Sequence, residues 1–111
     1  MAKLELSKML EVGKSVVYYP ELTSITGGVT ATLLLSYLVH WPGHEEDEDR
    51  WGYVTQEELT ACLGLSRSEQ ETARRNLVGR GLLEEKKKGI PCRLWYRVNM
   101  ENLVDALQKR R

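Results

Sequence analysis

Apolar residues in the second half of the chain recur at helical spacing and predict two short helices. Leu59, Cys62 and Leu63 form an apolar stripe on the first helix, with Cys62 in the core. Ala73 and Leu77, one helical turn apart, give the second helix its core-facing side. The residues between these positions are mostly polar or charged, so each helix is expected to bury one face.

Start and stop signals place the ends of these helices. Thr55 with Glu58 and Ser66 with Glu69 are capping boxes, in which two side chains satisfy backbone N–H groups at a helix start. Gly64 is suited to the left-handed conformation that ends a helix. The two starts lie eleven residues apart, which predicts a helix, a three-residue turn and a second helix.

After the second helix the pattern changes to the alternation of a β-hairpin. Its strands are expected at 82–88 and 93–99, joined by a turn at 89–92. A short strand at 51–54 is expected to pair with the hairpin. Trp95, on the polar face, either offers an indole for stacking on an unpaired base or packs under neighbouring side chains. The hairpin tip is basic, with Lys86, Lys87, Lys88 and Arg93.

Further elements are expected on either side of this region. Residues 29–41 predict the central helix of the core, 2–12 an amphipathic helix, and 100–109 a final helix capped by Asn99, while 16–19 are β-prone. Each terminal helix either covers the end of the core or pairs with a second copy across a two-fold axis. The predicted core side of the central helix comprises Val29, Leu33, Leu34, Tyr37, Leu38 and Trp41.

Charge is divided unevenly along a chain whose formal net charge is zero. Residues 1–63 contain four Lys or Arg and ten Asp or Glu, a balance of −6, whereas residues 64–111 contain twelve and six, a balance of +6. The positive half is typical of a surface that binds phosphates. The alternative is that these charges are ordinary solvated surface residues. Five consecutive acids at 45–49 need water and predict a solvated loop.

Length and composition fit one cytoplasmic domain. The chain has 111 residues, 41% of them hydrophobic, which is enough for one core. No secretory signal or membrane-spanning run is visible, and Cys62 and Cys92 make neither a disulfide framework nor a zinc pattern. Pro42 separates His40 from His44, so no metal site is expected. No catalytic set emerges, and we expect neither an enzyme nor a cofactor.

The order of helix, turn, helix and hairpin over residues 55–98 resembles the winged helix-turn-helix family. The resemblance implies an α+β fold, with a three-helix core, a β-hairpin wing and additional N- and C-terminal helices. It implies a single domain, with an N-terminal extension (1–28), a winged-helix core (29–99) and a C-terminal helix (100–111). The strings VTATLLLSYLVHW, WGYVTQEE and SRSEQETARR look like the N-terminal winged helix of phage and plasmid replication-initiation proteins.

The resemblance and the charge distribution together imply sequence-specific binding to double-stranded DNA. The chain would act as a small transcriptional regulator or a replication-initiation module, as a homodimer joined through its terminal helices. In the recognition helix (66–80), Arg67 can bind guanine, and Gln70 can bind adenine if it is not turned inward. The basic wing (82–98) would follow phosphates, so affinity would fall steeply with salt. The expected DNA contacts are Thr55, Ser66, Arg67, Ser68, Gln70, Glu71, Arg74, Arg75, Lys86, Lys87, Lys88 and Arg93.

Two other interpretations of the same residues stay open. Arg67, Glu71 and Arg75 are spaced four residues apart, and can form an exposed ion-pair ladder worth about 0.3–0.5 kcal/mol per pair. The domain can also be a protein-interaction winged helix that does not bind DNA. In that case the terminal helices and Trp95 would contact a partner protein.

Overall fold

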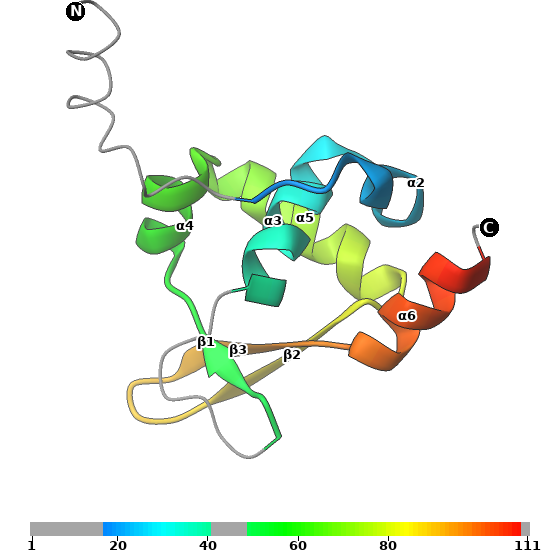
Figure 1. The fold of residues 1–111 in the computed structure, drawn as a ribbon. Helices are drawn as coiled ribbons and strands as arrows, with labels where there is room; N and C mark the ends of the chain where they lie inside the picture. Colours follow the sequence, from blue (N-terminus) through cyan, green and yellow to red (C-terminus); the bar gives the residue numbers. More distant parts are fainter. Residues whose placement is uncertain (1–16, 41–48, 110–111) are drawn as a thin grey trace, which may run out of the picture.

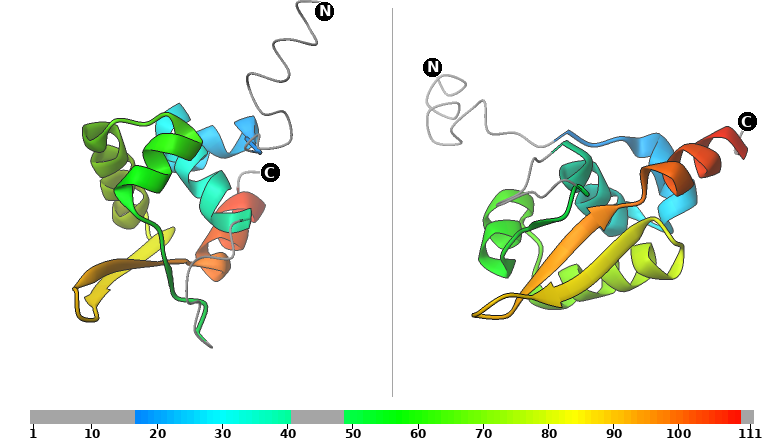
Figure 2. Two further views of the ribbon diagram at one scale, coloured as in Figure 1. Left: turned by 90° about the vertical axis from the view of Figure 1, so that its left-hand side faces the viewer. Right: turned by 90° about the horizontal axis from the view of Figure 1, so that it is seen from below.

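Helices cover one face of a three-stranded antiparallel sheet, so the chain has an α+β fold (Figure 1). The computed structural model describes residues 17–40 and 49–109. Seen from below in Figure 2, the β2–β3 hairpin lies in front of the helices, which pack on its far face. The sheet order is β1-β3-β2, with β1 at Gly52–Tyr53, β2 at Leu83–Lys88 and β3 at Arg93–Val98.

The chain ahead of the sheet is helical. Gly27, with a φ of 95°, permits the sharp turn into the central helix α3. The helical segments before and after this turn meet at 110°. By length and composition alone the two together could cross a membrane as a bent pair, but no single helix among the described residues is long and apolar enough to do so. The elements are the 3-10 helix η1 (Pro20–Leu22), α2 (Thr23–Thr26) and α3 (Val29–His40).

The strand expected at 16–19 is wrong for its described part. Residues 17–19 have no partner strand, and the Tyr19 carbonyl instead accepts a hydrogen bond from the Leu22 N–H at 3.0 Å, as a helical turn begins. The predicted helix at 2–12 and the acids at 45–48 lie outside the described residues.

The central helix α3 packs in the core, and the side predicted to face it is confirmed in part. Ala31, Leu34 and Leu35 are buried, whereas Val29 is 59% exposed. The prediction for Val29 was wrong because apolar residues occur all round this helix, so its sequence does not single out one face. Leu33, Leu34, Tyr37 and Leu38 are buried or partly buried, and Trp41 lies outside the described residues.

The predicted pair of short helices is confirmed. Helix α4 spans Gln56–Leu63 and helix α5 spans Arg67–Gly79. Gly64 between them has a φ of 71°, the left-handed conformation expected of a helix end. Leu65 is buried beneath the turn. Leu59, Ala73 and Leu77 are buried as predicted, whereas Cys62 is exposed.

The hairpin is also confirmed, and its register separates two faces of the sheet. Glu85 pairs with Tyr96, and Lys86 with Trp95, so alternate residues point to opposite sides. Leu83 and Tyr96 lie in the core under the helices. Strand β1 pairs antiparallel with β3, as expected for the segment 51–54.

The final helix, α6, spans Met100–Lys109 and begins where the sequence predicts. The Asn99 side chain accepts a hydrogen bond from the Asn102 N–H at 2.9 Å, which satisfies one of the unpaired donors of the helix start. Leu103 is buried against the core. Helix α6 lies at the opposite end of the sheet from the hairpin tip (Figure 1).

Candidate nucleic-acid interface

Helix α4 starts at a capped N-terminus that faces the hairpin. The Thr55 hydroxyl accepts a hydrogen bond from the Glu58 N–H at 3.1 Å, and it donates to the Glu58 carboxylate at 3.2 Å. Gln56, the first residue of the helix, is exposed beside this cap. The start of α4 therefore exposes the Gln56 amide side chain, whereas the Thr55 hydroxyl is engaged with Glu58, and the acids Glu57 and Glu58 lie in the first turn.

Helix α5 begins with a complete capping box. The Ser66 hydroxyl accepts from the Glu69 N–H at 3.2 Å, and the Glu69 carboxylate accepts from the Ser66 N–H at 2.9 Å. Hydrogen bonds to its carboxylate from the Ser66 backbone, and then from the Ser66 side chain, lower the pKa of Glu69, because they favour its charged form. The carboxylate occupies the helix start, so this terminus is not an open anion site, although Arg67 and Ser68 extend from it into solvent.

Gln70 is turned inward, so the condition for its contact with adenine is not met. Only 2% of the residue is exposed. Its amide nitrogen, which carries two N–H bonds, lies within hydrogen-bond distance of three acceptors: the Gln56 carbonyl at 3.2 Å, the Thr60 hydroxyl at 3.0 Å and the Leu65 carbonyl at 3.0 Å. Gln70 therefore ties α5 to α4 and to the turn between them, which is a structural role.

The remaining outward side chains of α5 include a short ion pair. Arg75 lies 3.2 Å from Glu71, and both are well exposed, as the ladder interpretation requires for this half. Arg67 is exposed one turn before Glu71. An exposed pair of this kind holds its arginine only weakly, so Arg75 stays available to an anion.

Arg74 does not point outward as predicted. Its guanidinium lies 3.3 Å from the Glu85 carboxylate on β2, and it also hydrogen-bonds Tyr96 on β3. Burial raises the pKa of the Tyr96 phenol, and Arg74 opposes that rise. Arg74 thus joins α5 to the hairpin, and its charge is already compensated there.

The cations of the hairpin lie mostly on aromatic rings. The Lys86 ammonium is 4.1 Å from the Trp51 ring centre, and the Lys88 ammonium is 3.9 Å from that of Trp95. Lys87, on the other face of the strand, is exposed. Trp95 is 6% exposed, so its packed interpretation is confirmed and an exposed stacking indole is not present.

Arg93 completes the tip beside β1. Its guanidinium donates to the Tyr53 hydroxyl at 3.0 Å and lies over the Tyr53 ring at 4.5 Å. The ring of Tyr53 meets that of Trp95 edge to face at 5.2 Å. These contacts hold the cationic tip in a defined shape, because cation–π contacts orient long side chains that otherwise move freely.

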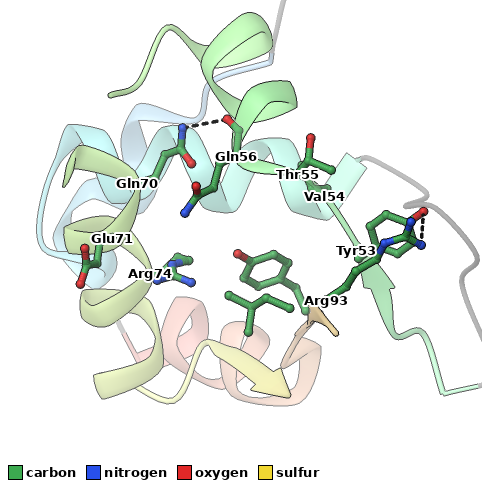
Figure 3. A pocket seen from close by; sticks show the side chains of 10 residues that line it. Tyr53, Val54, Thr55, Gln56, Gln70, Glu71, Arg74 and Arg93 are labelled. Carbon is green, nitrogen blue, oxygen red and sulfur yellow. Dashed lines mark hydrogen bonds between the residues drawn. The ribbon is translucent and has the colours of Figure 1, made fainter. Parts of the chain in front are cut away.

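A groove of about 220 Å³ separates α5 from the sheet (Figure 3). The start of α4 forms one end of it, and Figure 3 shows Glu71 and Arg74 on one wall, with Tyr53 and Arg93 across from them. The groove therefore brings together the parts of α4, α5 and the hairpin that the sequence singled out. It is lined by Tyr53, Val54, Thr55, Gln56, Gln70, Glu71, Arg74, Arg93, Leu94 and Tyr96.

Sequence reasoning missed the aromatic side chains beneath the cations. Trp51 and Tyr53 were expected only to form a strand, yet their rings lie under Lys86, Arg93 and Arg97. The signal was present in the alternation: Tyr53 pairs with Trp95, and the register then stacks the rings on one face.

The described residues offer no metal site. Across 17–40 and 49–109, no three His, Cys, Asp or Glu side chains lie close enough to share an ion. His40 packs against Tyr19, with the phenol oxygen 2.5 Å from its Nε2 atom. Cys62 and Cys92 are free thiols, and the Tyr37 hydroxyl donates to the Cys62 sulfur at 3.7 Å.

Comparisons with known proteins add no relative to this picture. No protein-family model, no curated protein and no solved structure matches the chain. The residues of the interface itself are therefore the basis for a function.

Proposed function

We propose that this chain is a winged helix-turn-helix module that binds double-stranded DNA, in transcriptional regulation or replication initiation. In this proposal α5 is the recognition helix and the β2–β3 hairpin is the wing. The observation that carries the proposal is the groove between α5 and the sheet, because exposed cations lie in or next to its lining. Arg93 lines the groove, Arg67 and Arg75 are each one helical turn from the lining residue Glu71, and Lys87 pairs with the lining residue Leu94.

In the proposed complex the first turn of α5 enters the major groove. Arg67 and Ser68 are exposed there and can reach base edges, and arginine is the side chain best suited to the two acceptors of guanine. Arg75 lies two turns further along the helix, where phosphates flank the groove. Gln70 supports this helix from behind and reads no base.

In the same complex, the sugar-phosphate backbone at the edge of the DNA major groove would lie across the protein groove between α5 and the sheet. The Gln56 side chain offers an amide at one end, and Arg93 offers a guanidinium at the other. Amide and guanidinium donors position a phosphate without reading sequence. Lys87 would then meet the next stretch of backbone.

Charge on the two helices alone favours a second function. Helices α4 and α5 together carry three arginines and four acids, whereas the hairpin carries five cations and two acids. The four acids are Glu57, Glu58, Glu69 and Glu71. A protein-interaction module without DNA binding fits a helix pair of this kind. A titration of duplex DNA with the protein decides between the two functions.

That experiment is fluorescence anisotropy of a labelled random-sequence duplex, titrated with protein of known mass in solution at several salt concentrations. If four or five phosphates are contacted, the logarithm of the affinity falls with the logarithm of the salt concentration with a slope of about −4. No binding at low salt would overturn DNA binding and favour the protein-interaction function.

The Arg67→Glu/Arg75→Glu variant tests the assigned surface. Both side chains are exposed, so the fold should survive, while the salt slope should lose at least about 1.8. Lys109→Glu is the matched control, since its side chain is 77% exposed on α6, away from the groove. Equal affinity of the double variant and the control would contradict the assignment.

A further inference from the structure

The tip of the β2–β3 hairpin carries a fully exposed isoleucine. Ile90 lies in the turn between the two strands, and its relative exposure is 103%. The next most exposed large apolar residue among the described ones, Val29, is 59% exposed. The whole apolar surface of Ile90 is therefore available to a partner.

The turn itself does not require an isoleucine. Turns favour glycine, proline, asparagine, aspartate and serine, whereas β-branched side chains favour strands. Gly89 supplies the positive φ of this turn, at 97°, and Pro91 has its φ fixed by its ring. Ile90 thus serves neither the turn conformation nor the core, and a stiff backbone on both sides holds its side chain outward.

Cations lie on both faces of the hairpin directly behind this tip. Lys88 pairs with Arg93 across the two strands, although like charges placed opposite each other are unfavourable. Lys87 is exposed on the other face. An apolar tip between two sets of cations is complementary to a groove that has phosphates along both edges and bases at its floor.

The hairpin is long enough to bring this tip to a second groove of the duplex. Glu85 contacts Arg74 of α5 at 3.3 Å, and Ile90 lies five residues further along the chain. At the rise of a strand, the tip lies at most about 17 Å beyond this contact. Half a turn of B-DNA is about 17–18 Å, so a hairpin anchored on an α5 in the major groove reaches the neighbouring minor groove.

We propose that Ile90 inserts between two base pairs from the minor groove and bends the duplex, an inference that rests on the proposed DNA-binding function. Apolar wedges of this kind partly unstack a base step and kink the DNA. Unstacking costs least at flexible pyrimidine–purine steps such as TA. The preferred partner is therefore a duplex with a flexible step beneath the hairpin tip, recognised by its deformability.

Two duplexes of equal A·T content serve as probes, one with several TA steps and the other with AA steps in their place. Resonance energy transfer between dyes on the two ends reports bending, and anisotropy reports affinity. The wild type should bend the TA duplex and bind it at least about threefold more tightly than the AA duplex. Lys87 and Arg93 are unchanged in every variant, so the phosphate contacts stay constant.

Ile90→Ser should abolish both the bend and the preference for TA steps. It removes no cation, so the salt slope of the remaining binding should equal that of the wild type. Ile90→Leu should keep the bend, because leucine also acts as a wedge. Val29→Ser is the matched control, since it removes an exposed apolar side chain from α3, outside the hairpin and the groove, and should bend DNA as the wild type does.

The outcomes separate this inference from the function on which it rests. Binding without a bend, or an equal bend by the wild type and Ile90→Ser, would overturn the inference and leave DNA binding intact. No binding to either duplex at low salt would overturn both.

A membrane surface is the other destination of an apolar tip beside lysines. Vesicles of equal parts phosphatidylcholine and phosphatidylserine test it by co-sedimentation. If the wild type binds these vesicles through Ile90 and does not bend DNA, the tip belongs to a membrane contact and the inference fails. Vesicle binding that Ile90→Ser does not change, together with an Ile90-dependent bend, would support the inference.

Discussion

The Arg74 guanidinium on α5 lies 3.3 Å from the Glu85 carboxylate on β2, with only 21% and 25% of the two side chains exposed. This ion pair joins α5 to the hairpin that follows it in the chain after residues 80–82. Because both groups are largely removed from water, the pair fixes the distance between α5 and the hairpin more firmly than a surface pair would.

Arg74→Met should destabilise the fold by about 1–3 kcal/mol, because it leaves the Glu85 carboxylate partly buried without its counter-charge. Adding Glu85→Met should recover part of the loss, and urea unfolding of the four proteins gives the coupling energy. Arg75→Met, at an exposed pair, should stay within about 0.5 kcal/mol of wild type. A coupling energy near zero would show that the pair does not join the two elements.

Gln70→Leu should lower the free energy of unfolding by about 1–3 kcal/mol. The change removes the amide nitrogen that lies within hydrogen-bond distance of the Gln56 carbonyl, the Thr60 hydroxyl and the Leu65 carbonyl, and it leaves the Leu65 carbonyl with the Thr60 hydroxyl as its remaining donor. Urea unfolding measures the effect, with the exposed Thr72→Ala as a control. If the two variants are equally stable, the amide does not hold the turn.

Glu69 should make α5 sensitive to acid. Its pKa is lowered in the folded state, so its contribution is present above the ordinary pKa of 4.5 and is lost as pH falls through the lowered value. In urea unfolding at a series of pH values, wild type should exceed Glu69→Gln at neutral pH. The difference should shrink as the carboxylate becomes protonated. A difference that is constant with pH would contradict this origin.

Lys87 and Lys88 should respond differently to the same substitution. Under the proposed function, Lys87→Gln should reduce the salt slope of DNA binding by about 0.9 and leave stability unchanged, because Lys87 is exposed. Lys88→Gln should also cost about 0.5–1 kcal/mol of stability, because it removes the ammonium from the Trp95 ring. Anisotropy and urea unfolding of both variants check these outcomes.

The helix ends could be predicted from sequence because they depend on neighbours within a few residues. Ser66 and Glu69 satisfy each other within one turn, and Asn99 caps α6 in the same local way. No distant contact is needed to form these hydrogen bonds, so their pattern is complete in the sequence.

Gln70 shows where local patterns mislead. It lies three residues before Ala73 and seven before Leu77, so it belongs to the buried stripe of α5 by spacing. Its polarity suggested an outward position. The carbonyl groups that accept hydrogen bonds from it lie on α4 and in the turn, and the local pattern does not reveal them. Helical spacing was the better guide here.

Arg74 and Cys62 depended on information that a sequence pattern does not hold. Arg74 borders the buried face of α5, and only the packing of α5 against the hairpin places Glu85 opposite it. Cys62 lies on the apolar stripe of α4, but it points to the edge of the domain, beside the Tyr37 hydroxyl. In both cases the neighbouring element decides the environment.

A single residue, Asn99, separates the end of β3 from the start of α6, and its N–H donates to the Leu82 carbonyl at 2.9 Å. Strand β3 and helix α6, which together run from Arg93 to Lys109, are therefore joined without a flexible linker. The six residues of β3 span about 20 Å, so this strand holds the hairpin tip at about that distance from the start of α6. Because β3 and α6 are joined in this way, a small rotation of α6 on the core would produce a larger displacement of the hairpin tip.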